Sequence, residues 1–185
     1  MAEASKRQAG ALRWASAELR SDVDFVSNVV EVHGSALQYA SEALRANKDV
    51  VLRALGSDGT ALKFASRHLA DDVRVVLAAV HNNGASLEFA SRTLQGNSDV
   101  VMEAVHSDGL ALQFASSALR GDVHIVTQAL AQLEIAVDDV RASAALLEEQ
   151  SCLSTSPCSK ALQIMSSVIT PQTLEQLKLA SGAKK

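Results

Sequence analysis

The stretch that decides the fold is GLALQFAS, Gly109–Ser116, because the chain writes nearly the same phrase five times at a constant interval. An aromatic residue followed by Ala-Ser recurs every 25 residues, and a leucine stands two positions before each aromatic. A fixed period of about 20 to 50 residues is typical of stacked repeat architectures. We therefore expect a repeat protein whose rings form one internal ladder. The rings are those of Trp14, Tyr39, Phe64, Phe89 and Phe114.

Two segments of each unit show helical spacing. In the first, apolar side chains between Leu37 and Leu44 cover about half of the helix circumference at roughly 100° per residue. In the second, the β-branched pair Val50-Val51 is followed three and four positions later by Ala54-Leu55. That is the spacing of a helix and not the alternation of a strand. Each unit is therefore predicted to be a pair of short helices.

Polar residues and glycines mark the ends of the second helix. A capping residue precedes it in every unit, and a glycine follows it in four units, where a positive φ would end the helix. One unit buries too little apolar surface to fold alone, so we expect neighbouring units to stabilise one another. The capping residues are Asp22, Asn47, Asp72, Asn97 and Asp122, and the glycines are Gly34, Gly59, Gly84 and Gly109.

Composition narrows the class of function. Of the 185 residues 48% are hydrophobic and 21% charged, as in an ordinary soluble globular protein, and the net charge is −4. Such a chain offers nucleic acid no electrostatic attraction, and the absence of an apolar run of about 18 residues predicts no membrane insertion. Residues 1–10 are polar and small, so we expect a disordered tail without a secretory signal. The default location is the cytoplasm, with an organelle interior as the alternative.

The C-terminal third departs from the repeat. Glu134 and Asp139 stand where the next glycine and aromatic would fall, and apolar residues form a seam from Val126 to Leu147. The sequence predicts that residues 134–185 form a long helix, a Ser/Thr/Pro-rich loop and capping helices that fold back on the stack. A homodimer through the Val126–Leu147 seam is the alternative to the expected monomer.

Repeated serines, histidines and two cysteines are the candidates for chemistry. A serine nucleophile needs one unique base, whereas five equivalent serines such as Ser116 share none, which favours a hydroxyl bonded to the preceding turn. Stacking would separate His81 from His106 by about 8–10 Å, too far for a shared metal ion. Cys152 and Cys158 lack the spacing of a redox or zinc pair. We expect no catalytic residue, cofactor or metal, and two loop thiols with a small disulfide as the alternative.

Basic side chains of the middle units form the candidate partner surface. The corresponding outer positions of other units hold neutral or acidic residues as well, so no continuous basic stripe is predicted. A solvated face of mixed charge and a surface for an acidic patch on a partner protein remain the two interpretations. The candidate residues are Arg53, Lys63, Arg67 and Arg92.

The repeat can be written as Val-Val-x-x-Ala-[Val/Leu]-x-x-[Asp/Asn]-Gly-x-x-Leu-x-[aromatic]-Ala-Ser-x-x-Leu. It fits Val50–Leu69, Val75–Leu94 and Val100–Leu119 throughout, whereas the first junction, Phe25–His33, departs from it. The pattern resembles the repeat of the domain-of-unknown-function family 4116, over about residues 11–133. The resemblance implies a helical repeat protein and no catalytic residues.

Together these patterns predict an all-α fold, an α-solenoid of five helix-pair repeats over residues 11–133 with a helical C-terminal cap. A leucine-rich-variant style stack, in which one helix of each pair is a tight 3₁₀ turn, is the alternative fold. The expected function is a non-enzymatic scaffold that binds a protein or peptide through variable outer positions. The alternative is a small accessory subunit, docked on a larger and possibly organellar assembly.

Overall fold

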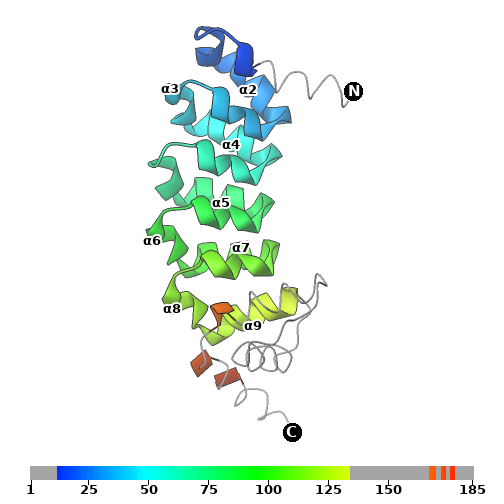
Figure 1. Ribbon diagram of the computed structural model, residues 1–185, viewed down its shortest axis with the longest axis vertical. Coiled ribbons are helices and arrows are strands. Elements are labelled where there is room, and N and C mark those ends of the chain that lie inside the picture. The colour runs from blue at the N-terminus through cyan, green and yellow to red at the C-terminus, as the bar shows by residue number, and fades with distance from the viewer. Residues whose placement is uncertain (1–11, 134–166, 170–171, 174–175, 178–185) are drawn as a thin grey trace.

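The computed structural model describes residues 12–133, 167–169, 172–173 and 176–177, and all regular structure in these ranges is helical. Five α-helices of ten residues each recur here at the interval of the sequence repeat. Figure 1 shows them stacked along the long axis, and each contacts the next. They are α2 (Val23–Val32), α4 (Lys48–Ser57), α5 (Val73–Asn82), α7 (Ser98–Ser107) and α9 (Val123–Gln132).

A second layer consists of 3₁₀ helices of six residues, one between successive α-helices. Each begins at the repeated glycine and ends at the repeated aromatic residue. Neighbouring 3₁₀ helices contact one another as well as the α-helices beside them. They are η2 (Gly34–Tyr39), η3 (Gly59–Phe64), η5 (Gly84–Phe89) and η6 (Gly109–Phe114).

A short helix of three or four residues completes each unit. It follows the Ala-Ser pair and returns the chain to the next α-helix, and α3, α6 and α8 line one edge of the stack (Figure 1). These helices are η1 (Leu19–Ser21), α3 (Glu42–Arg45), η4 (Leu69–Asp71), α6 (Arg92–Gln95) and α8 (Ser117–Arg120).

The first predicted helix of each unit is therefore wrong as a single element, because the chain breaks at the Ala-Ser pair. Ala40 is extended, with φ −67° and ψ 156°. The N–H of Ser41 donates to the carbonyl oxygen of Arg20 in the preceding unit at 2.9 Å, and not to a carbonyl of its own helix. The same bond recurs in each later unit at 2.8–2.9 Å. The alternative with one 3₁₀ turn in each unit agrees with this geometry.

The second predicted helix is confirmed together with its N-terminal caps. The side chain of Asn47 accepts hydrogen bonds from the N–H groups of Asp49 and Val50, at 3.0 and 3.4 Å. Asp22, Asp72, Asn97 and Asp122 cap the other α-helices in the same way. Local sequence thus determines where each α-helix begins.

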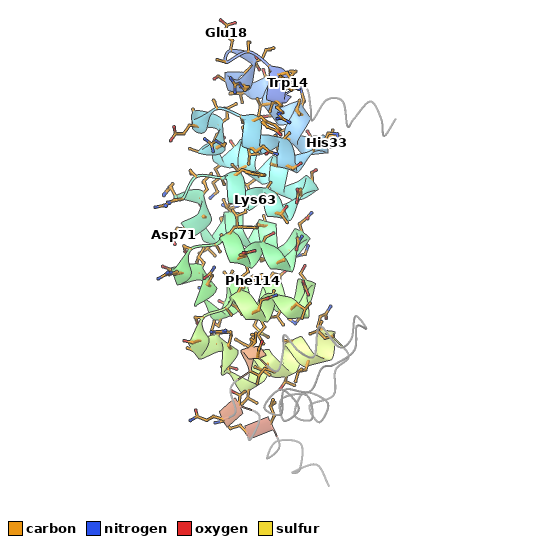
Figure 2. The ribbon with its side chains drawn as sticks, viewed as in Figure 1. Trp14, Glu18, His33, Lys63, Asp71 and Phe114 are labelled. Carbon is orange, nitrogen blue, oxygen red and sulfur yellow. The ribbon has the colours of Figure 1, made fainter. Side chains whose placement is uncertain are left out.

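The internal ladder consists of leucines and not of rings, which corrects the prediction. In a 3₁₀ helix of about three residues per turn, positions two apart point in different directions, so the leucine faces the core while the aromatic two positions later lies at the rim. Tyr39 and the phenylalanines of the ladder are only partly buried, and Trp14 at the N-terminal end of the stack is 83% exposed (Figure 2). Each ladder leucine is at most 1% exposed: Leu12, Leu37, Leu62, Leu87 and Leu112.

The repeated glycines serve close packing and not a positive φ, which is a second correction. The C-cap of α4 is Asp58, whose extended backbone (φ −148°, ψ 104°) makes the turn. A Cβ on Gly59 would lie 2.4 Å from the carbonyl oxygen of Ala79 in the next unit's α5. A Cβ on Gly34, Gly84 or Gly109 would lie 2.3–2.7 Å from the equivalent carbonyl oxygen. The glycine therefore lets two units approach to backbone contact.

The described C-terminal residues lie against the last unit. Ile169 and Leu177 are each 4% exposed and belong to the core, and the hydroxyl of Thr173 donates to the carbonyl oxygen of Gly121 at 3.1 Å. The predicted long helix beyond Leu133, the Ser/Thr/Pro-rich loop and the tail 1–10 lie outside the described residues. Of the predicted seam, Val126 and Leu130 are buried in the stack.

Two glycine substitutions in the same unit test the packing role. We expect Gly59→Ala to lower the free energy of unfolding by about 1–3 kcal/mol, because the methyl group would collide with the Ala79 carbonyl. Gly56→Ala is the control, since Gly56 lies inside α4 with nothing within 4 Å of an added Cβ. It should stabilise the protein by about 0.4–1 kcal/mol. Equal effects of the two changes in urea unfolding would contradict the packing role.

Candidate functional site

The four predicted surface residues lie on different parts of the stack. Arg53 belongs to α4, and its Nη1 lies 3.4 Å from a carboxylate oxygen of Glu31 in α2. Lys63 belongs to η3, and its Nζ lies 4.8 Å from the ring centre of Phe64 (Figure 2). Arg67 and Arg92 occupy the same slot of neighbouring units, directly after the repeated serine. Only these last two form a row, and all four residues are exposed.

Arg53 is the least suited of the four to an acidic partner. It already pairs with Glu31, and it lines a hollow of about 470 Å³ between α2 and α4. The carboxylates of Asp24 and Asp49 line the same hollow. An acidic partner would meet like charges there.

Pairs of polar side chains on the α-helical layer join neighbouring units. Besides the Glu31–Arg53 pair, the Nδ1 atom of His81 lies 2.7 Å from a carboxylate oxygen of Glu103. His106, in the slot of His81 one unit on, is exposed. No group of three or more His, Cys, Asp or Glu side chains in the described residues could hold a metal ion. Cys152 and Cys158 lie outside those residues.

A third pair joins a helix cap to the unit before it. The Nζ atom of Lys48 lies 2.5 Å from a carboxylate oxygen of Asp72, the N-cap of α5. The two side chains are 37% and 26% exposed. The hydrogen bond from Lys48, followed by those from the backbone N–H groups of Val75 and Arg74, lowers the pKa of Asp72 despite its partial burial. The charged form of Asp72 is thus the one that the fold stabilises.

Among the repeated serines, Ser91 and Ser116 bond through their hydroxyl oxygens to N–H groups that follow them in the chain and not to the preceding turn, which corrects the prediction. The Oγ atom of Ser91 accepts from the N–H of Leu94 at 3.2 Å, and Ser116 does the same for Leu119 at 3.5 Å. These serines are N-caps of the short helices. The hydroxyl oxygens of Ser41 and Ser66 are buried, and neither has a hydrogen-bond partner.

A small hollow lies at the first joint, where the short helix of one unit meets the Ala-Ser pair of the next. Its volume is about 220 Å³. The Nε atom of Arg20 and the Oγ atom of Ser41 are buried here without hydrogen-bond partners. Sequence reasoning missed this site, although arginine recurs in the slot of Arg20. The hollow is lined by Ala17, Arg20, Ser21, Tyr39, Ala40 and Ser41.

The Lys48–Asp72 pair predicts a specific dependence of stability on pH. Because the folded pKa of Asp72 is lowered, its stabilising effect is complete above the unfolded pKa of about 3.9 and is lost as pH falls through the folded value. We expect Lys48→Met to cost at most about 1 kcal/mol at neutral pH, since the pair is partly exposed. The cost should shrink below about pH 4.

Ser98→Met is the matched control for this measurement, because Ser98 occupies the slot of Lys48 two units later. Its effect on the free energy of unfolding should not change between pH 7 and pH 3. A cost of Lys48→Met that grew on acidification would contradict the assigned pair.

Comparison with known proteins identifies the family. Residues 1–45 and 47–95, about half of the chain, match a family described as Domain of unknown function (DUF4116), and each match spans about two repeat periods. No curated protein and no solved structure matches the chain significantly. None of the described helices combines the length and the apolar character needed to cross a membrane. On the strength of its repeated glycine and its aromatic-Ala-Ser sequence, which fall in register across both matches, the chain belongs to the DUF4116 family.

Proposed function

We propose that the chain is a solenoid of five helical repeats over residues 11–133 that binds a protein or peptide partner and catalyses no reaction. This proposal is supported above all by a contrast between the buried and the exposed positions of the repeat. The leucine two positions before the aromatic residue is the same in all five units, whereas the slot between them, exposed in four of the units, varies. It holds Arg13, Gln38, Lys63, Glu88 or Gln113. A uniform frame with variable outer side chains is the arrangement that repeat proteins use for recognition.

The edge formed by the short helices is the part of the surface that best suits an acidic partner. Arg67 and Arg92 lie there in equivalent positions of adjacent units. Neither forms an ion pair with a carboxylate among the described residues. Both cations are therefore free to meet opposite charges on a partner, an effect that acts mainly on specificity and association rate.

The accessory-subunit alternative assigns docking to the Val126–Leu147 seam. Its described part argues against an open docking face, since Val126 and Leu130 are fully or almost fully buried. The contact of Thr173 with Gly121 favours a C-terminal segment that covers the stack. For this reason the interaction module is the preferred proposal, with the C-terminal residues as its cap.

Charge reversal at the edge tests the proposed function. We expect Arg67→Glu/Arg92→Glu to leave the melting temperature almost unchanged, because both side chains are exposed. The same variant should capture a partner from a lysate of the native organism at least about tenfold less well than wild type. Captured proteins are identified and quantified by mass spectrometry.

Arg74→Glu/Ser98→Glu/Gln132→Glu is the matched control, because it makes the same change in net charge at exposed positions of α5, α7 and α9. The control variant should capture the partner protein as well as wild type does. If neither wild type nor control enriches any protein over an empty resin, or if the control loses as much as the edge variant, the proposed surface is wrong.

A further inference from the structure

One slot of the repeat distinguishes the first two joints from the later ones. It lies four residues after the repeated serine, at the end of the short helix, and its carbonyl oxygen accepts the hydrogen bond from the next unit's serine N–H. That bond uses the backbone, so the side chain in this slot is free to vary. From the first unit to the fifth the slot holds Arg20, Arg45, Ala70, Gln95 and Arg120.

Neutral residues fill the slot without leaving a polar atom unpaired. Gln95 donates from its side chain to the carbonyl oxygens of Leu87 and Glu88, at 3.1 and 3.2 Å. Ala70 has no polar side chain to satisfy. The frame therefore does not need an arginine here.

Arg20 and Arg45, by contrast, carry buried donors without acceptors. The Nε atom of each is buried and has no hydrogen-bond partner, as is also true of Arg120 in the last unit. Neither Arg20 nor Arg45 forms a salt bridge within the described residues. The hydroxyl oxygens of Ser41 and Ser66, one in each of the same two joints, are also unpartnered. Unpaired buried donors on a cation destabilise the free protein. Both arginines are only partly buried as residues, so a ligand can reach the exposed part of each side chain from solvent, although the Nε atom itself is buried.

The third joint, between the third and fourth units, shows which group the repeated serine hydroxyl binds. There the hydroxyl of Ser91 donates to the carboxylate of Asp71, which lies on the edge of the stack (Figure 2). In the first two joints the slot of Asp71 holds Ser21 and Ala46, neither of which has a carboxylate. The joint that supplies its own carboxylate has alanine in the arginine slot, and the first two joints, without one, have arginine. The fourth joint, with Gly96 in the slot of Asp71, has the neutral Gln95.

We propose that the first two joints each bind a carboxylate of an acidic segment of the partner protein. Arg20 and Ser41 hold the first carboxylate, and Arg45 and Ser66 the second. A guanidinium matches a carboxylate in shape and charge, and the serine hydroxyl donates to it as Ser91 does to Asp71. The inference rests on the proposed function and names the chemistry of the partner.

The first joint has two features that the second lacks. Its 220 Å³ hollow gives room for a side chain to enter, and the aromatic at its rim is Tyr39, whose hydroxyl is a further donor. The second joint has Phe64 in that position. The first carboxylate is therefore the more tightly held.

The spacing of the units sets the spacing of the ligand. Packed helices lie about 8–10 Å apart, and a peptide in the polyproline II conformation has three residues per turn and advances about 3.1 Å per residue. Two carboxylates three residues apart on such a segment point to the same side, about 9 Å apart, and therefore match the two joints.

A labelled peptide tests this chemistry directly. The probe is a fluorescein-labelled Asp-Gly-Ser-Asp-Gly-Ser-Asp peptide, and the same peptide with asparagine in place of aspartate is the neutral control. Fluorescence anisotropy with the full chain should detect binding of the acidic peptide and much weaker binding of the neutral one. In ¹⁵N–¹H spectra of the arginine side chains, the Nε–H signals of Arg20 and Arg45 should shift during the titration, because these donors gain an acceptor.

Glutamine is the informative substitution, since the frame already accepts it at Gln95. Arg20→Gln should weaken binding of the acidic peptide by about tenfold or more, and Arg45→Gln should also weaken it. Arg74→Gln removes one charge from an exposed position of α5 and should change the affinity by less than about twofold. Thermal unfolding of each variant confirms that the fold is retained.

Three results would overturn the inference. One is an equal loss of affinity in Arg74→Gln and Arg20→Gln, which would indicate unspecific attraction. Another is equal binding of the neutral peptide. The third is inorganic phosphate shifting the same arginine signals at lower concentration than the peptide, which would indicate a free oxyanion as the ligand.

Partner capture separates this inference from the proposed function. Capture that depends on Arg67 and Arg92 but survives Arg20→Gln/Arg45→Gln in full would leave the interaction role standing and reject the joint sites. Specific binding of the acidic peptide without capture of any protein would support the joint sites and reject the proposed interaction role.

Discussion

The contact on which the rest of the structure depends is the approach of a glycine backbone to the carbonyl oxygen of an alanine in the next unit. Gly59 meets Ala79 so closely that a Cβ would lie 2.4 Å from the carbonyl oxygen. The side chain of Asn82 then accepts the Gly59 N–H at 3.1 Å and donates to the carbonyl oxygen of Gly56 at 3.0 Å. Backbone contact at this distance lets the leucine ladder and the valine pairs close over one continuous core.

A second backbone contact, between the serine N–H and the carbonyl at the end of the preceding short helix, fixes the opposite edge of each joint. Because both contacts use main-chain atoms, many side chains along the edge contribute little to stacking. That freedom explains how one slot can hold Arg20, Ala70 or Gln95 on the same frame. The proposed recognition role requires surface side chains that can vary while backbone contacts hold the units together.

The α-helical layer and the edge formed by the short helices differ in how their charged groups are paired. On the α-helical layer, charged side chains pair across joints, as Glu31 does with Arg53 and Lys48 with Asp72. Along the edge of the short helices, Arg20 and Arg45 have no such partners among the described residues. Paired charges are already satisfied within the protein, so the edge is where an acidic partner gains most from new contacts.

The sequence by itself determined the helical class, the period and the α-helices with their caps, because hydrophobic spacing and capping are local properties. Only the tertiary structure decided the break at Ala40-Ser41, the reason for Gly59 and the unpaired donors of Arg20. Each of these depends on an atom in a neighbouring unit, about 20 to 25 residues away in the chain. A local pattern carries no information about such a contact until the units are stacked.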